Sequence, residues 1–301
     1  MAQALSRLPL PPLTLQVNNR RLMQGFFEGI GAPDPAAVMR AVDRLDKVSP
    51  DHVRRLLTVE ARLDDKQADA CLHLAGIVTT DTSFVEQVRA LKVEHPLLEQ
   101  GLEELAAVVD GASGAATDTF TLTADLRIAR GLDYYTGTVF ETRMSGYESL
   151  GSICSGGRYD ALASDGRSTY PGVGISLGIT RLLAPLIARG VVDGSRSVPS
   201  AVLVALPSDD DRPRARQVAR ALRVRGIPTE VAPAAAKFGK QIRFAERRGI
   251  PYVWFPGEPD SVKDIRAGDQ VEADAASWMP AGADLRPTIV TRTPPSPGET
   301  Q

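Results

Sequence analysis

Between residues 120 and 128 the chain alternates strictly between apolar and polar side chains. The apolar positions are Phe120, Leu122, Ala124, Leu126 and Ile128, and the polar positions between them are Thr121, Thr123, Asp125 and Arg127. A period of two predicts a strand with one buried face. Arg130 follows where this parity would put another core residue, and an unpaired charge there is costly. The pattern by itself therefore predicts an internal ion pair that closes a β-hairpin.

Helical periodicity dominates the chain before this strand. Residues 13–17 predict a short strand, and the residues from about 20 to 30 predict a helix that stops at Gly31. Residues 35–109 predict several further helices. The stretch 110–116, rich in glycine and alanine, predicts a soft linker.

Two of the predicted helices begin with capping signals. Ser49 is followed by proline at the first helical position. Asp64 and Gln67 have the spacing of a capping box. Both signals fix a helix start to within a residue or so.

The pattern changes after the glycine- and serine-bearing segment 194–199, which predicts a domain boundary. Beyond it, strands and helices alternate. The predicted strands are 201–206, 227–231 and 251–255, and the predicted helices are 212–225 and 237–248. The first strand is apolar throughout, as is typical of a buried parallel strand. This alternation predicts an α/β domain with a mainly parallel sheet.

Composition narrows the class of protein. The chain has 301 residues, enough for two or three domains, and 43% hydrophobic residues, which is ordinary for a globular protein. No apolar run is long enough to span a membrane, and no signal segment opens the chain, so we expect no membrane partner. The net charge of −2 means that a nucleic acid would have to bind local basic patches.

The cysteines and histidines predict neither a disulfide framework nor a metal site. Two cysteines, Cys71 and Cys154, favour a reducing cytoplasm, and Cys154 is best interpreted as a small buried apolar residue. None of the three histidines stands in a metal-binding pair. Cys71 and His73 alone are a poor zinc site, because structural zinc takes four ligands.

Three segments carry the densest chemistry. Residues 129–141 read ARGLDYYTGTVFE, residues 152–160 read SICSGGRYD, and residues 171–182 read PGVGISLGITRL. The first resembles the histidine-binding arginine-glycine-leucine-aspartate-tyrosine-tyrosine motif of histidyl-tRNA synthetases. The second resembles the glycine-rich histidine-specific motif of that family, and the third resembles motif 3 of class II synthetases. Three motifs in this order are a specific signal, whereas one alone would be weak.

The resemblance implies an α+β class II synthetase catalytic-core remnant, with an antiparallel sheet and a helical insertion, followed by an α/β anticodon-binding-like domain. The boundaries that we expect are 1–34 for the strand and helix after motif 2, 35–112 for the helical insertion, 113–193 for the core with the histidine-specific motifs and motif 3, 194–200 for a linker, 201–290 for the anticodon-binding-like domain, and 291–301 for a disordered tail.

The implied activity is that of a histidine–tRNA ligase, which activates histidine with ATP and transfers it to tRNA(His). Arg130 is the implied catalytic residue, contacting both the α-phosphate and the histidine carboxylate. A forked, permanently charged guanidinium suits that position, and its loss would cost about a hundredfold or more in rate. Arg181 is implied to bind the γ-phosphate of ATP, with Mg²⁺ accompanying the nucleotide. The alternative for Arg181 is an ordinary surface arginine on a helix.

Five further residues are implied in histidine binding. Tyr134, Tyr135 and Tyr159 would line the pocket, since a tyrosine offers an apolar wall and a hydroxyl for an imidazole nitrogen. Gly156 and Gly157 would let the backbone approach the amino acid closely. The alternative is that the three tyrosines are core aromatics.

A basic row in the last domain suggests contact with tRNA. Lys240, Arg243 and Arg247 share one face of the predicted helix, while Phe238 and Ile242 take the other face. Clustered cations are what phosphate contacts require. The alternative is a solvated helix face, and the row supports either interpretation equally.

The resemblance covers residues 13–290 and the back part of the family's chain. Motif 1, which builds the family's homodimer interface, and motif 2, whose arginine holds the α-phosphate, have no counterpart in the sequence. One interpretation is a truncated synthetase, and another is a non-catalytic tRNA-binding paralogue. A regulatory subunit of ATP phosphoribosyltransferase is a third, although it usually lacks an anticodon domain. We expect that the isolated chain does not make histidyl-adenylate at a normal rate.

Overall fold

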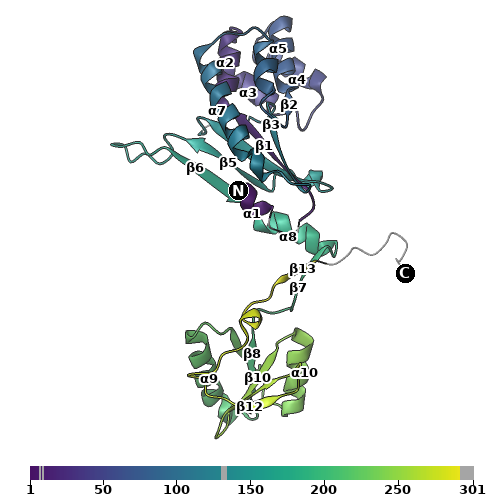
Figure 1. Ribbon diagram of the computed structural model, residues 1–301, viewed down its shortest axis with the longest axis vertical. Helices are drawn as coiled ribbons and strands as arrows, with labels where there is room; N and C mark the ends of the chain where they lie inside the picture. Colours follow the sequence, from purple (N-terminus) through teal and green to yellow (C-terminus); the bar gives the residue numbers. More distant parts are fainter. Residues whose placement is uncertain (7, 9, 130–133, 292–301) are drawn as a thin grey trace, which may run out of the picture. The chain divides into compact units, whose positions relative to one another are not determined.

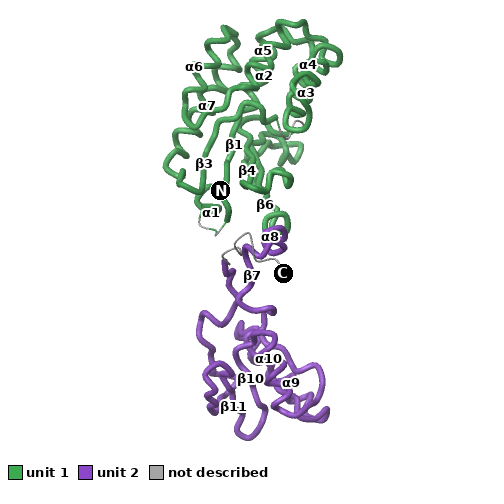
Figure 2. Tube along the Cα trace, turned by 90° about the vertical axis from the view of Figure 1, so that its right-hand side faces the viewer, with its two compact units in different colours: residues 1–182 green, residues 183–301 purple. Residues whose placement is uncertain are grey.

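The computed structural model describes residues 1–291 except residues 7, 9 and 130–133. The predicted disordered tail, 291–301, begins at the last described residue, Thr291, which is the end of a strand, and the rest of the tail lies outside the described residues. The chain divides into two compact units, residues 1–182 and 183–301 (Figure 2). The six domain boundaries expected from the sequence are finer than this division and stay a prediction.

The first unit is built on a six-stranded sheet (Figure 1). Its strands are β1 (Leu13–Asn19), β2 (Val78–Thr79), β3 (Phe120–Asp125), β4 (Thr138–Met144), β5 (Cys154–Tyr159) and β6 (Gly172–Leu177), in the order β2-β3-β1-β4-β5-β6. The sheet is antiparallel, as expected, except that β1 and β3 run parallel. A parallel pair requires a long crossover, and residues 20–119 supply it.

Helices connect and flank the strands of this sheet. They are α1 (Ala2–Leu5), α2 (Arg20–Gly29), α3 (Pro35–Val42), α4 (Pro50–Val59), α5 (Asp65–Ala75), α6 (Phe84–Arg89) and α7 (Pro96–Ala112), with the short turns η1 (Ser113–Ala115) and η2 (Glu148–Leu150). α7 packs on β1 and β3, whose side chains Leu13, Leu15 and Phe120 are buried. Both predicted caps are confirmed, since Ser49 accepts a hydrogen bond from the His52 amide and Asp64 forms a capping box with Gln67.

The predicted linker at 110–116 is wrong in its first half, because α7 continues through Ala112 and is followed by η1. One glycine in a helix costs only about 1 kcal/mol, and Leu105 and Val109 are buried on the packed side of α7. Tertiary packing therefore outweighs the local signal at Gly111.

Two glycines let α2 and α7 cross with their backbones in contact. A Cβ atom added to Gly25 would lie closer than 3.0 Å to the backbone of Leu98, and one added to Gly101 would lie equally close to the backbone of Leu22. Real Cβ atoms essentially never approach backbone so closely. Any other residue at either position would force these two helices apart.

The second unit is an α/β sheet in the order β12-β11-β10-β8-β9. Its strands are β8 (Val202–Val204), β9 (Thr229–Val231), β10 (Tyr252–Phe255), β11 (Ser261–Asp264) and β12 (Gln270–Glu272); α9 (Arg212–Val224) and α10 (Phe238–Arg248) are its helices, and η3 (Asp209–Asp211) and η4 (Gly282–Asp284) are short turns. β8, β9 and β10 are parallel, as predicted, and β11 and β12 extend the sheet antiparallel. α9 and α10 lie on opposite sides of the sheet (Figure 1).

Two elements join this α/β sheet to the rest of the chain. α8 (Ile179–Ala188) contains the boundary between the two units, and β7 (Val192–Gly194) pairs with β13 (Ile289–Thr291). The predicted apolar strand is confirmed as core, because every residue from Ala201 to Leu206 is fully buried. None of the helices in the described part of the chain is long and apolar enough to cross a membrane.

Candidate active site

A row of polar side chains crosses five strands of the first sheet on the face opposite α7. Residues opposite each other on neighbouring strands share a face, and the register joins Thr123, Gln16, Glu141, Ser155 and Ser176 in one line. Glu141 is only 2% exposed. The sheet thus has an apolar face under α7 and, opposite it, a polar face that can bind a hydrophilic ligand.

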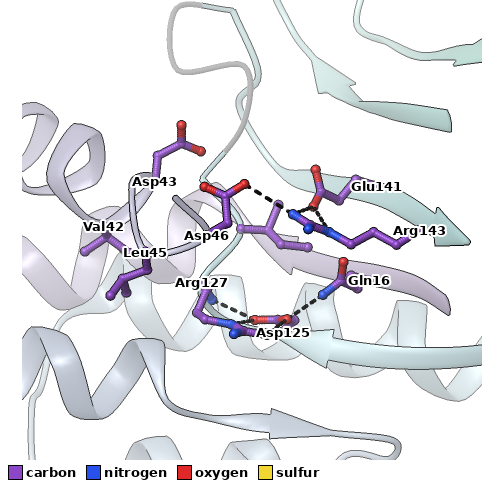
Figure 3. A pocket seen from close by; sticks show the side chains of 10 residues that line it. Gln16, Val42, Asp43, Leu45, Asp46, Asp125, Arg127, Glu141 and Arg143 are labelled. Atoms are coloured by element: carbon purple, nitrogen blue, oxygen red, sulfur yellow. Dashed lines mark hydrogen bonds and ion pairs between the residues drawn. The ribbon is translucent and has the colours of Figure 1, made fainter. Parts of the chain in front are cut away.

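A charged cavity of about 320 Å³ opens on this polar face (Figure 3). It is lined by Gln16, Val42, Asp43, Leu45, Asp46, Asp125, Arg127, Ile128, Glu141 and Arg143. Asp125, 1% exposed, accepts hydrogen bonds from Arg127 Nε at 2.9 Å, Arg127 Nη2 at 2.6 Å and Gln16 Nε2 at 2.6 Å. The forked contact holds the pKa of Arg127 above its usual value and compensates the burial of the carboxylate.

Arg143 links the helical region to the sheet. Its Nη2 atom lies 3.0 Å from Glu141 Oε1 and 3.2 Å from Asp46 Oδ2 (Figure 3). Asp46 follows α3, whereas Glu141 and Arg143 lie on β4. A buried carboxylate without such a partner would be strongly destabilising.

A second cavity, of about 610 Å³, adjoins the first and shares Asp46, Glu141 and Arg143 with it. Its other lining residues are Lys47, Tyr134, Tyr135, Glu148, Ser149, Leu150, Gly151, Ser152, Ser155, Gly156 and Arg181. Four of the residues assigned to histidine or ATP by resemblance therefore meet around one space: Tyr134, Tyr135, Gly156 and Arg181.

The two adjacent tyrosines pack together at the wall of the second cavity. Their ring centroids are 4.3 Å apart, and Tyr134 is 44% exposed. Burial, together with a hydrogen bond to Tyr134, raises the pKa of Tyr135 to about 12, so its hydroxyl stays protonated. A Cβ atom on Gly157 would lie 2.8 Å from the Tyr135 ring, so glycine is needed where the strand passes beneath it.

Tyr159 lies farther along β5 and outside the lining of the second cavity. Its ring covers the glycines of β6, since a Cβ atom on Gly172 would be 2.8 Å from the Tyr159 hydroxyl oxygen. The pKa of the next residue, Asp160, is lowered by the neighbouring Thr136 and Arg158 side chains, and the Thr136 amide donates a hydrogen bond of 2.9 Å to the Arg158 carbonyl. The glycine strand is thereby tied to the segment that follows Tyr135.

Arg181 lies in the first turn of α8 and is exposed. Its Nη1 atom donates a hydrogen bond of 2.8 Å to the carbonyl of Ser152. That bond anchors one end of the guanidinium at the cavity. The position fits both a phosphate ligand and the alternative of a surface arginine.

Arg130, the implied catalytic residue, lies outside the described residues, as do its neighbours to position 133.

Both cysteines are buried, and burial raises the pKa of the Cys71 thiol to about 12. His73 is exposed on another side of α5 from Cys71. Within the described ranges, no group of three or more histidine, cysteine or acidic side chains could hold a metal ion.

The sequence reasoning missed several residues of the polar face, notably Gln16, Asp125, Arg127 and Arg143. The available signal was strand parity, because each is a polar residue in a strand or directly after one. Parity alone does not say which strands are neighbours, so it could not bring these residues together.

In the second unit, the side chains of the basic row Lys240, Arg243 and Arg247 are exposed on α10. No hydrogen bond or ion pair of these three side chains occurs with any residue that the structure describes. Other arginines of this unit are engaged, for example Arg225, which donates to the carbonyls of Ala275 and Trp278. The row therefore presents uncompensated positive charge.

The chain resembles known proteins along most of its length. Residues 1–182 match the family profile described as histidyl-tRNA synthetase, and residues 201–274 match the one described as anticodon binding domain. A histidine–tRNA ligase of Cutibacterium acnes is 55% identical over 96% of the chain, and one of Micrococcus luteus is 54% identical over 96%. The chain spans 66% and 64% of the length of these two relatives.

Comparison with solved structures leads to the same family. The crystal structure of a histidyl-tRNA synthetase from a Nostoc species matches with a TM-score of 0.67 and 30% identity, over 90% of this chain and 65% of the other. A Bacillus halodurans protein described as an ATP phosphoribosyltransferase regulatory subunit/histidyl-tRNA synthetase matches with a TM-score of 0.54 over 80% of this chain and 60% of the other. At 20% identity the latter likeness concerns the fold alone.

Proposed function

Because the chain belongs to the histidyl-tRNA synthetase family, we propose that it carries the histidine-binding part of a histidine–tRNA ligase site. The observation that carries the proposal is the second cavity, where Tyr134, Tyr135, Gly156 and Arg181 meet on the polar face of the sheet. Residues that lie up to 47 positions apart in the sequence would have no other evident reason to line one space.

The proposed chemistry is attack of the histidine carboxylate on the α-phosphorus of ATP, followed by transfer of histidine to tRNA(His). Arg130 would neutralise charge on the carboxylate and the α-phosphate, and Arg181 would hold the γ-phosphate. Mg²⁺ would enter with the nucleotide, since it is usually held by phosphates and few carboxylates.

Protonated tyrosine is suited to an imidazole side chain. The raised pKa of Tyr135 keeps its hydroxyl available as a donor or acceptor at neutral pH. Sites that hydrogen-bond a polar group reject analogues lacking that group far better than apolar pockets do. Gly156 would complete the pocket along β5, while Gly157 and Tyr159, which lie outside the lining of the cavity, would support it by packing against Tyr135 and the glycines of β6.

Calorimetric titration of the 301-residue chain with histidine and with Mg-ATP tests this assignment. We expect histidine to bind, Tyr135→Ala to weaken histidine binding about tenfold or more, and Arg181→Ala to weaken ATP binding only. Arg167→Ala, a charge removal at an exposed loop, is the matched control. Histidine binding that is absent, or that is unchanged in Tyr135→Ala, would refute the proposed pocket.

The second unit is proposed to bind tRNA(His), supported by the anticodon-binding profile and by the basic row on α10. That profile also favours a synthetase over a regulatory subunit of ATP phosphoribosyltransferase.

A homodimer and a cytoplasmic location are proposed from the family. For the 301-residue chain alone we expect histidine-dependent ATP–pyrophosphate exchange near background, because it spans only 66% and 64% of the length of the two relatives.

A further inference from the structure

Phe238 is an exposed aromatic residue at the start of α10, although helical periodicity assigns it to the buried side. Its side chain is 42% exposed. The ring packs edge to face on Phe255, with centroids 4.9 Å apart and planes at 75°. Phe255 ends β10 and is 9% exposed, so the buried ring holds the exposed one at the carboxyl end of the parallel strands.

Small residues surround the exposed ring. The segment before α10 contains Pro233, Ala234, Ala235 and Ala236, and Pro233 and Ala234 are exposed. A Cβ atom added to Gly239 would meet nothing within 4 Å. No bulky side chain of this segment therefore shields Phe238 from a large planar ligand.

The charge beside Phe238 favours an anionic partner. Lys237 precedes it and Lys240 follows within the same turn, and both are exposed. Neither lysine side chain makes a hydrogen bond or ion pair with the described residues. Two of the acidic residues that follow β8 are engaged locally, since Asp209 pairs with Arg212 and Asp211 accepts hydrogen bonds from the amide and hydroxyl of Ser208.

The position in the fold also points to a ligand. β8 is flanked by β9 on one side and β10 on the other, so the strand order reverses beside β8. Ligands of open α/β sheets bind outside the carboxyl ends of the strands at such a reversal. Phe255 and Phe238 stand at that end of β10.

We propose that the Phe238 ring is a stacking platform for an unpaired base of a single-stranded RNA loop, with Lys237 and Lys240 on the adjoining phosphates. The inference rests on the proposed tRNA partner and adds the residue that would receive a base. Aromatic stacking tolerates any base, because every base has a π-face, whereas lysine contacts follow the backbone charge.

The test is fluorescence anisotropy of the full chain with a labelled RNA hairpin that reproduces the anticodon arm of tRNA(His), and with the same hairpin carrying abasic loop positions. We expect Phe238→Ala to weaken binding of the intact hairpin about tenfold, with little effect on the abasic one. Phe238→Tyr should retain affinity. Phe238→Leu, which keeps an apolar contact with Phe255, should lose it. Val224→Ala, at an 81% exposed apolar residue of α9, is the control and should bind like the wild type.

The salt dependence separates stacking from charge. Removing Lys237 and Lys240 should lower the slope of log affinity against log salt by about one to two, whereas Phe238→Ala should leave that slope unchanged. Equal affinity of wild type and Phe238→Ala for the intact hairpin overturns the stacking role, as does an equal loss on the abasic hairpin. A wild-type chain that binds neither hairpin overturns the tRNA partner and the stacking role together.

Discussion

The two units end their sheets differently. In the second unit the central strands β8 and β10 are buried, and the edge strand β12 offers a glutamine, Val271 and a glutamate. In the first unit the edge strand β6 exposes Val173 at 64% and Ile175 at 58% between glycines. An apolar edge strand is a site for pairing with another chain. The second sheet therefore ends in a more polar strand, while the first leaves apolar surface uncovered.

A spectroscopic difference lets the two units be followed separately. Both tryptophans of the chain, Trp254 and Trp278, lie in the second unit and pack edge to face, with centroids 5.6 Å apart. Trp254 is fully buried. Tryptophan fluorescence therefore reports unfolding of the second unit alone, and circular dichroism reports both.

The largest effect that we expect is a loss of stability of the first unit, with the stability of the second unit unchanged. Gly101→Ala places a Cβ atom against the backbone of Leu22 and should destabilise the first unit by about 3 kcal/mol or more. Gly111→Ala in the same helix meets nothing within 4 Å and should be neutral or stabilising by about 0.5–1 kcal/mol. Denaturation followed by circular dichroism measures both changes. A coincident shift of the tryptophan signal in Gly101→Ala would mean that the units do not unfold independently.

A smaller effect should appear only in the second unit. Gln241 is 3% exposed; its side chain accepts from the Leu206 amide and donates to the carbonyls of Leu206 and Ala236. Gln241→Leu removes the partner of the Leu206 amide and of the Ala236 carbonyl, while the Leu206 carbonyl still accepts from the Ala236 amide, and the change should cost about 2 kcal/mol. The midpoint of tryptophan fluorescence in urea measures this loss. The neighbouring exposed variant Lys240→Gln should leave the midpoint where it is, and an unchanged midpoint in Gln241→Leu would contradict the account.

The smallest effect depends on pH. The Arg266 hydrogen bond, together with that of Tyr252, holds the pKa of Asp284 below its ordinary value of 3.8. A carboxyl with a depressed folded pKa contributes stability that is full above its unfolded pKa and is lost as pH falls through the folded pKa. Because Arg266 is half exposed, we expect this contribution to be about 1 kcal/mol at most.

Asp284→Asn should therefore lower the stability of the second unit near neutral pH and flatten its decline below about pH 4. Tryptophan fluorescence melts across that range measure the effect. Asp274→Asn, whose side chain accepts a hydrogen bond from the Ala276 amide, serves as the comparison. Parallel curves for wild type and Asp284→Asn would contradict the assigned role of Arg266.

Elements whose signals are local were predicted well from the sequence. The start of α4 at Ser49, the capping box at Asp64 and the buried strand from Ala201 were all found where expected. β11 and β12 were missed, because short polar strands on an exposed edge have no apolar period to detect. Phe238 was assigned to a buried face because its position in the helical period does not reveal that the helix begins at the carboxyl end of the parallel strands.

The sequence by itself determined the family, the helix starts and the residue types of the site, because each is written in contiguous residues. The tertiary structure decided which of these residues meet. Gln16 and Asp125 are 109 positions apart, yet they are joined by a hydrogen bond of 2.6 Å. Strand pairing fixes which side chains share a face, and parity within one strand carries no information about its neighbours. The polar face and its two cavities therefore exist only in the folded sheet.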